Sequence, residues 1–292
     1  MRFVPSRIAW LLLLGLLPTS LLTGCAEPPQ LLQKAPVTAT ATIEPLGYLL
    51  DRVGGERVDV QVLIPTGRSP HEYEPRPGDL KALLESDLLL RVGHPSFAFE
   101  ERLLESTTER SPDLQQISLM EVAGTAVEGL EEPHPWLAPP VLELIARELG
   151  ERLAEIDPEG ADGYRQRAEA FAAEARALEA ELAQFLAASP CRAFLVDHPA
   201  WGAFARRYGL VELAIEHGGK EPGPASLQHT VEAARVARIQ LMLVRPGRPE
   251  ATSLSVARAL GAETEVLDPL SRDIPATLRK AAELISRSCD HD

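Results

Sequence analysis

Short apolar segments and amphipathic segments alternate along the chain after residue 36. Continuous or alternating apolar residues predict strands, and apolar residues at helical spacing predict helices. In the first half we expect strands at 37–43, 58–64 and 87–92, helices at 44–53 and 77–85, and further regular segments at 97–105 and 114–120. Alternation of this kind predicts a parallel sheet that is covered on both faces.

The second half of the chain shows the same alternation of segments, although its sequence is not a repeat of the first half. We expect strands at 192–196, 210–215, 239–244 and 263–267, and helices at 199–208, 225–236, 249–260 and 274–286. The pattern therefore predicts a second α/β lobe.

Between the two halves, residues 140–189 are rich in Ala, Leu, Glu and Arg. Asp157-Pro158 predicts a break, with Asp157 as the N-cap of a second helix that runs from about residue 158 to 188, roughly 45 Å long. Its apolar residues form one stripe, which favours a helix lying along a globular body over a coiled-coil arm. The stripe comprises Phe171, Ala175, Leu178, Leu182 and Phe185.

The predicted fold class is therefore α/β, with two parallel-sheet lobes joined by a long, rigid spine helix and a site in the cleft between the lobes. We place the N-terminal lobe at residues 36–139, the linking helices at 140–189 and the C-terminal lobe at 190–292.

The N-terminus has the pattern of a signal peptide. Arg2 and Arg7 precede a short apolar run, which ends in Leu22-Thr23-Gly24-Cys25 and resembles the bacterial lipobox. An ordinary signal peptide with a chance cysteine is the alternative. The small residues before Cys25 and the proline-rich segment after it favour a lipoprotein signal at 1–24, lipidation of Cys25 and a tether at 25–35. We expect an exported protein, in the periplasm or on the outer face of the cytoplasmic membrane.

The charge of the chain limits its partners. Residues 1–24 contain two arginines and no acid, so their removal changes the formal net charge from −14 to −16. This acidity argues against nucleic acid as a partner and against flat binding to anionic lipid. We therefore expect contact with the membrane only through the lipid anchor.

Two further cysteines remain after Cys25. In an oxidising compartment, Cys191 and Cys289 are expected to pair and to tie the C-terminus to its own lobe. A thiolate metal site is the alternative, but neither cysteine has a partner cluster in the sequence.

Three histidines and one aspartate lie next to prolines in loops. They occur in Ser-Pro-His71-Glu-Tyr-Glu-Pro, Pro-His134-Pro-Trp, Asp-His198-Pro and Leu-Asp268-Pro. Proline restricts its own backbone and that of the residue before it, so these loops are stiff. Three imidazoles and a carboxylate form a complete four-coordinate set for zinc. His71, His198 and Asp268 each follow a predicted strand, where ligands bind in open α/β sheets.

These segments resemble those of the solute-binding proteins of bacterial ABC importers for zinc and manganese. The resemblance rests on residues 63–75, on Pro133–Pro139, which is similar to "D-P-H-x-W-L-D-P", on 198–210, which is similar to "H-x-A-F-x-Y-F-A-x-x-Y-G-L", and on 267–270. Together these segments span nearly the whole mature chain in the family's order.

The resemblance implies a monomeric receptor, not an enzyme, that delivers its metal to an ABC importer permease. It implies His71, His134, His198 and Asp268 as the metal ligands. Manganese-binding members usually carry a glutamate at the position of His198, so zinc is the expected ion and manganese or iron the alternative.

The chain departs from the family's pattern in several places. Glu132 and Ala138 replace two aspartates, Trp201 and Ala203 replace two aromatic residues, and Arg245 stands where a glutamate is frequent; the family's His- and acid-rich loop is absent, with only residues 128–132 hinting at it. We expect His94 at the rim of the site, and Trp136 and Trp201 either packed over the histidines or within the lobe cores. A zinc hydrolase and a metal buffer or adhesin without a transporter are the alternative functions.

Overall fold

Eight parallel strands organise the part of the chain that the computed structural model describes, residues 37–124, 132–216, 223–247 and 251–289. The first sheet contains β1 (Val37–Ala41), β2 (Val58–Val62), β3 (Leu88–Arg91) and β4 (Gln115–Ser118) in the order β2-β1-β3-β4. The second contains β5 (Ala193–Val196), β6 (Val211–Ala214), β7 (Leu241–Val244) and β8 (Glu263–Val266) in the order β6-β5-β7-β8. Neighbouring strands pair in parallel throughout.

Both sheets have the same winding. The first strand of each lies between the second and the third, so the loops that leave the two central strands turn to opposite sides. A crevice opens at the carboxyl ends of the strands at such a point. The loops that carry His71, His198 and Asp268 follow β2, β5 and β8 at these ends.

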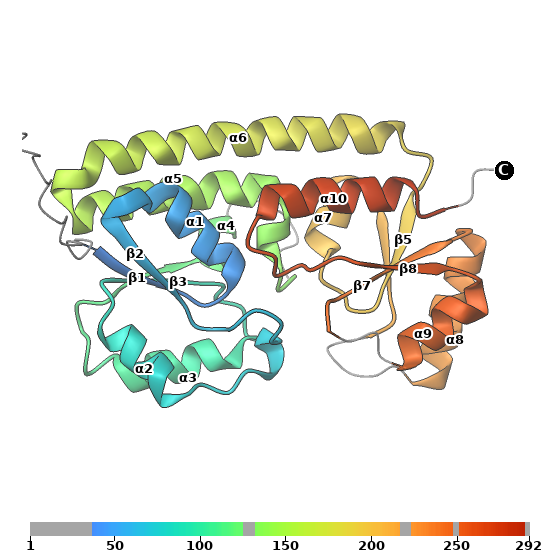
Figure 1. The fold of residues 1–292 in the computed structure, drawn as a ribbon, viewed down its shortest axis with the longest axis horizontal. Helices are drawn as coiled ribbons and strands as arrows, with labels where there is room; N and C mark the ends of the chain where they lie inside the picture. Colours follow the sequence, from blue (N-terminus) through green and yellow to red (C-terminus); the bar gives the residue numbers. More distant parts are fainter. Residues whose placement is uncertain (1–36, 125–131, 217–222, 248–250, 290–292) are drawn as a thin grey trace, which may run out of the picture. The chain divides into compact units, whose positions relative to one another are not determined.

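Helices cover both faces of the first sheet (Figure 1). Helix α1 (Glu44–Gly54) packs on β1 and β2, while α2 (Pro77–Leu84) and α3 (Ala98–Thr107) lie on the other face. Prolines stand in the first turn of α1 and α2, where no backbone N–H is lost from the helix. The short helix α4 (Leu119–Ala123) begins at Ser118, whose hydroxyl accepts from the backbone of Glu121.

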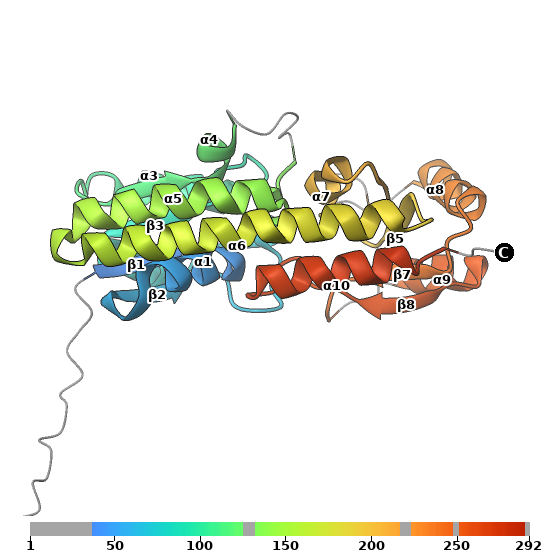
Figure 2. The same ribbon diagram turned by 90° about the horizontal axis from the view of Figure 1, so that it is seen from above.

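Two antiparallel helices link the halves of the fold. Helix α5 (Pro139–Ile156) is followed by a 3-10 turn at Pro158–Gly160 and by α6 (Ala161–Ala188). Figure 2 shows that α6 passes α5 and α1 and then lies beside α10 (Ile274–Ser286), and these helices are in contact. The long spine predicted up to residue 188 is therefore present.

Two details of this spine prediction were wrong. Asp157 stands at the N-cap of the 3-10 turn and not of α6, and its carboxylate makes no cap hydrogen bond but accepts from Arg57 and from the hydroxyl of Tyr164. Phe185 is 47 % exposed, whereas Leu186 is buried. The buried stripe continues from Leu182 by four residues, as the helical period requires, and so bypasses Phe185.

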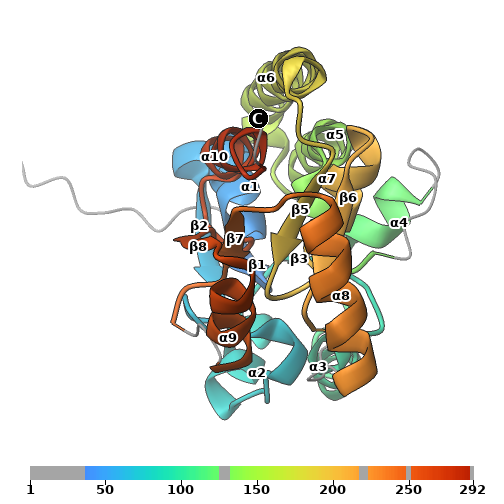
Figure 3. The same cartoon turned by 90° about the vertical axis from the view of Figure 1, so that its right-hand side faces the viewer.

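The helices of the second half are α7 (Gly202–Arg207), α8 (Pro224–Val236), α9 (Ala251–Leu260) and α10. Figure 3 shows α8 and α9 on the opposite side of the second sheet from α6 and α10. The predicted start of α7 at residue 199 was wrong. The Glu212 carboxylate accepts the backbone N–H groups of Ala200 and Trp201, which holds this segment outside the helix.

The central strands of the second sheet, β5 and β7, are buried on both faces, as a parallel sheet requires. Phe194 and Val196 of β5 belong to a core that extends through α5 and α6 to the first sheet, whereas Leu195 between them packs with α8 and α9 residues. Because one core joins both halves, residues 35–292 form one compact unit by contact. The lobe boundaries at 139/140 and 189/190 stay a prediction.

Cys191 and Cys289 form a disulfide bond, with their Cα atoms 5.8 Å apart. Cys289 also pairs with Ile239 in an isolated antiparallel bridge, so the end of the described chain is tied to the second sheet. Cys25 and the predicted signal segment lie outside the described residues. No helix in the described ranges has both the length and the apolar composition that a membrane span needs.

Candidate metal site

His71 lies on a 3-10 turn (Pro70–Glu72) in the loop after β2. Pro70 is buried and opens this turn, which fixes the backbone that carries the imidazole. The ring of His71 stacks on Phe97, with ring centres 4.8 Å apart, and the Ser96 backbone hydrogen-bonds the side chain. Neighbours on the β3–α3 loop thus orient this half-buried histidine.

His134 lies just before the 3-10 turn Pro135–Leu137 that leads into α5. The side chain is almost fully buried, and its Nδ1 donates to Oε1 of Glu132 at 2.5 Å. The ring of Trp136 meets the His134 ring edge-on, with centres 5.2 Å apart. Trp136 thus packs against the histidine and also lies in the core, so both expectations for this residue hold.

His198 follows β5 directly. Its Nδ1 donates to Oε2 of Glu216 at 2.7 Å, and its backbone N–H donates to Oδ1 of Asp197 at 2.9 Å. Both acids are buried, so one fixes the ring of His198 and the other fixes its backbone. Trp201 is also buried, and its ring packs edge-on against Phe204.

The three imidazoles converge. Ligand nitrogens of His71, His134 and His198 all lie within 4.8 Å of one another, and Nε2 of His71 lies 3.3 Å from Nε2 of His134. A carboxylate only accepts hydrogen bonds, so the Nδ1 atoms of His134 and His198 carry protons. In a neutral ring this leaves the lone pair on Nε2, and a partner on the other nitrogen fixes the orientation of a metal-binding histidine.

Burial favours the neutral form of His71 and His134 by lowering the pKa of each. Desolvation, together with the neighbouring His134 and His198, lowers the pKa of His71 to about 3. Burial also lowers the pKa of His134, although the hydrogen bond with Glu132 opposes this shift. Burial alone would raise the pKa of Glu216, but the hydrogen bond to His198 and the charge of Arg245 hold it below its usual value. Neutral imidazoles are the form that binds metal ions.

Asp268 follows β8 and lines the same cavity as the three histidines. This cavity has a volume of about 410 Å³ and also includes Arg68, Glu72, Glu216, Arg245 and the 246–247 turn in its wall. Oδ1 of Asp268 accepts from the backbone of Leu270 at 2.9 Å, and burial raises the pKa of Asp268. Asp268 is not a member of the compact group that the three histidines form.

The other histidines of the described residues are not members of this group. The Nδ1 atom of His94 is bonded within its own loop to Ser96, and His229 is exposed on α8. His217 and His291 lie outside the described residues.

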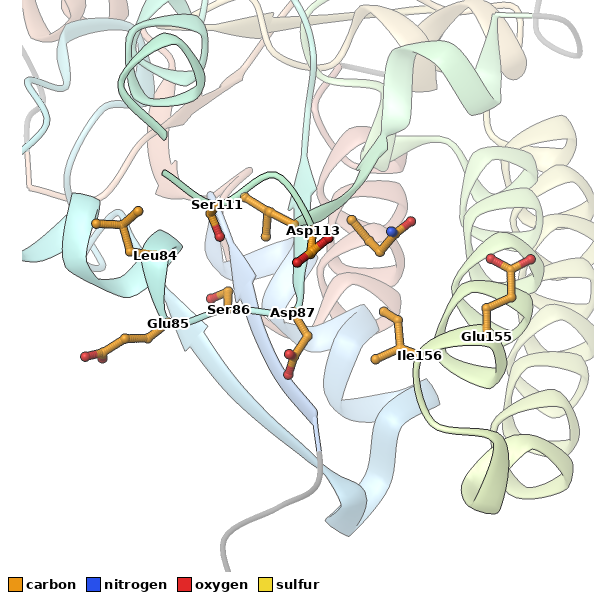
Figure 4. Close-up of a pocket in the computed structure, with 10 residues that line it drawn as sticks. Leu84, Glu85, Ser86, Asp87, Ser111, Asp113, Glu155 and Ile156 are labelled. Carbon is orange, nitrogen blue, oxygen red and sulfur yellow. The ribbon is translucent and has the colours of Figure 1, made fainter. Parts of the chain in front are cut away.

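A second cavity of about 430 Å³ lies at the amino ends of β3 and β4. Its polar lining consists of acids, serines and a glutamine, with no histidine among its wall residues. Figure 4 shows Glu85 and Glu155 on opposite sides of this cavity. The separated carboxylates do not form a metal-binding group comparable to the histidines.

Every strand of the second sheet contributes a charged or ligand-type residue at its carboxyl end. These are Asp197 and His198 after β5, Glu216 after β6, Arg245 after β7 and Asp268 after β8. Sequence reasoning missed the roles of Glu216 and Asp197 and described Arg245 only as a departure. Their positions directly after predicted parallel strands were a signal that could have identified them.

Comparison with known proteins agrees with this geometry. A protein-family model described as ZnuA, the periplasmic component A of a zinc-uptake complex, matches residues 40–283. The chain belongs to this family. The predicted resemblance to solute-binding proteins of metal importers is thereby confirmed.

Individual relatives cover much of the chain. A putative metal-binding protein of Chlamydia muridarum is 24% identical over 245 residues, which cover 81% of this chain and 86% of that protein. The manganese-binding lipoprotein MntA of Halalkalibacterium halodurans is 29% identical over 199 residues, 65% of this chain and 64% of that protein. The match thus spans slightly less than two thirds of that lipoprotein.

A crystal structure of ZnuA superposes on this chain with a TM-score of 0.79 at 33% identity. The superposition covers 86% of this chain and 98% of that one. The predicted α/β architecture with two parallel sheets and a long linking helix is confirmed as the fold of the ZnuA family.

Proposed function

We propose that this protein is an extracytoplasmic receptor that captures a divalent metal ion, zinc in the first place, and delivers it to the permease of an ABC importer. The observation that carries the proposal is the convergence of three buried or half-buried imidazoles with ligand nitrogens within 4.8 Å of one another. The family supports the same function, because its model is described as the periplasmic component A of a zinc-uptake complex.

The proposed ligands are the Nε2 atoms of the three histidines and the carboxylate of Asp268. Glu132 and Glu216 accept from the Nδ1 atoms of His134 and His198 and so leave the Nε2 lone pairs of these rings for the ion. Asp268 lines the same cavity and supplies one negative charge. Four protein ligands close a zinc site and leave no position for an activated water, which suits capture rather than catalysis.

The donor set favours zinc over manganese. Three nitrogen donors suit zinc, whereas manganese prefers carboxylate, carbonyl and water oxygens. One similar protein is named as manganese-binding, so the family supports a divalent metal more broadly than it supports zinc.

The remaining parts of the proposal concern the location of the receptor. Lipidation of Cys25 would anchor a monomer outside the cytoplasmic membrane through the tether at 25–35. The lobes at 36–139 and 190–292 would then hold the ion between them, next to the permease.

A competition titration tests this function. The full chain, kept soluble in a mild detergent, is titrated with zinc in the presence of a chromophoric chelator, and manganese is then added as competitor. The proposal expects one tight zinc site, which His198→Glu weakens or shifts toward manganese. A zinc affinity no higher than that of exposed surface histidines would contradict it.

The hydrolase alternative rests on the same histidines, with a water in place of Asp268 and Asp268 or Glu72 as base. Ester or peptide hydrolysis that rises with zinc occupancy and disappears in Asp268→Asn would support this alternative. The receptor proposal expects no such activity.

A further inference from the structure

The Glu216 carboxylate is shared between an imidazole and a guanidinium. Its Oε2 accepts from Nδ1 of His198 at 2.7 Å, and its Oε1 accepts from a terminal nitrogen of Arg245 at 2.5 Å. Arg245 also donates from Nε to Oδ2 of Asp197 at 3.1 Å. A guanidinium from the end of β7 therefore lies between two acids that hold His198.

The corresponding acid beside His134 has different surroundings. In the described part of the chain, the recorded ion pair of Glu132 is with His134 alone. Its other neighbour is an acid, since a Cβ atom added at Gly202 would contact both the Glu132 and the Glu212 carboxyl groups. Glu132 is thus accompanied by a second carboxyl group, whereas Glu216 is accompanied by a cation.

This difference has a chemical consequence. A carboxylate that accepts from one nitrogen of a histidine makes the other nitrogen a stronger donor to a metal. A guanidinium on the same carboxylate withdraws part of that negative charge. Arg245 also lines the cavity of the histidines, where its charge repels a divalent cation. Both effects act in the same direction.

We propose that Arg245 is a positioning residue that lowers the metal affinity of the site, acting through Glu216 on His198. The inference rests on the proposed function, because it concerns the same metal site. A receptor has to release its ion as well as capture it, and a neutralised acid behind His198 makes this ligand weaker than His134, whose acid has no such cation among the described residues.

The test compares Arg245→Gln, Glu216→Gln and the double variant with the wild type, all as full chains in detergent. Zinc dissociation constants come from chelator competition, and the ligand-field spectrum of bound Co²⁺ reports the geometry at the metal. We expect Glu216→Gln to weaken zinc binding about tenfold or more, the usual size of such effects. Arg245→Gln should tighten it, by up to about tenfold. This gain should be clearly smaller in the Glu216→Gln background, where only the direct repulsion of the ion is relieved.

Two control variants separate the proposed route from simpler causes. Arg68→Gln removes an exposed arginine from the wall of the same cavity and should change zinc affinity less than Arg245→Gln does. Arg245→Lys keeps the positive charge and should leave zinc affinity within about threefold of the wild type. Circular dichroism confirms that each variant is folded, and Arg245→Met replaces Arg245→Gln if that variant does not fold.

Opposite signs are the decisive feature, because a merely structural role would weaken binding in every variant. Zinc binding that is unchanged or weaker in folded Arg245→Gln overturns the inference, as does tightening in Arg245→Lys. An equal gain in Arg68→Gln, or a gain of undiminished size in the Glu216→Gln background, also overturns the route through Glu216. A wild-type chain without a tight zinc site would refute the proposed function itself.

Discussion

The indole nitrogen of Trp136 donates a hydrogen bond of 2.8 Å to the backbone carbonyl of Pro269, which is 133 positions further along the chain. Trp136 is fully buried and packs against His134, and Pro269 follows Asp268. One side chain therefore connects the loop of a histidine from the first half with the loop of the proposed carboxylate ligand from the second half.

Trp136→Phe should lower both stability and zinc affinity. The variant leaves the buried carbonyl of Pro269 without its donor, which costs about 1–3 kcal/mol. Urea denaturation measures the loss of stability, and chelator competition measures zinc affinity. Trp201→Phe, which removes an indole from another buried position, is the control and should affect stability alone. If both the urea midpoint and the zinc affinity of Trp136→Phe equal those of the wild type, the two loops are not coupled through this hydrogen bond.

Acid should destabilise the metal-free protein partly through His71. Its pKa is near 6.5 when unfolded and about 3 when folded, so the unfolded chain binds more protons between these values. Stability therefore falls as the pH drops from about 6.5 toward about 3. In His71→Gln the loss of stability over this window should be smaller than in the wild type. Parallel stability–pH curves for the two proteins would refute this assignment.

Glu212 should act in the opposite direction. Burial and the nearby Glu132 raise its pKa from 4.5 to about 7, so the folded state holds a proton that the unfolded state loses first. Its contribution to stability is present below pH 4.5 and is lost as the pH rises through about 7. Glu212→Gln can still accept from the backbone of Ala200 and Trp201, and should be more stable than the wild type at pH 8. If the stability of Glu212→Gln relative to the wild type decreases between pH 5 and pH 8, this prediction is wrong.

The disulfide should stabilise the C-terminal part of the fold. Cys191 and Cys289 are 98 positions apart, and a bond that closes so long a loop contributes about 2–4 kcal/mol. The Cys191→Ser/Cys289→Ser double variant should unfold at lower urea concentration, and the reduced wild type should behave like it. If reductant leaves the wild-type midpoint unchanged, the bond does not contribute to stability.

Local patterns were sufficient to predict the elements of the fold. The buried strand β3 begins with three consecutive leucines, and α10 has the bounds that its pattern predicted, with Asp273 capping its start. The start of α7 could not be predicted, since it depends on Glu212, a residue of the neighbouring strand.

The candidate site could be predicted only in part. Histidines flanked by prolines are visible in the sequence, but the partners of their second nitrogens are not. Glu216 is 18 positions from His198, and Arg245 is 29 positions from Glu216. These contacts arise from the pairing of β5 with β6 and β7, and strand order cannot be deduced from hydrophobic periodicity.

A crystal structure of the zinc-loaded protein tests the central claim most directly. Anomalous scattering on the two sides of the zinc absorption edge locates the ion and identifies it. The account predicts one strong peak in the cavity, about 2.0–2.2 Å from ligand atoms. Those atoms should belong to four side chains, His71, His134, His198 and Asp268. A zinc peak elsewhere on the protein, with none among the three histidines, would contradict the account.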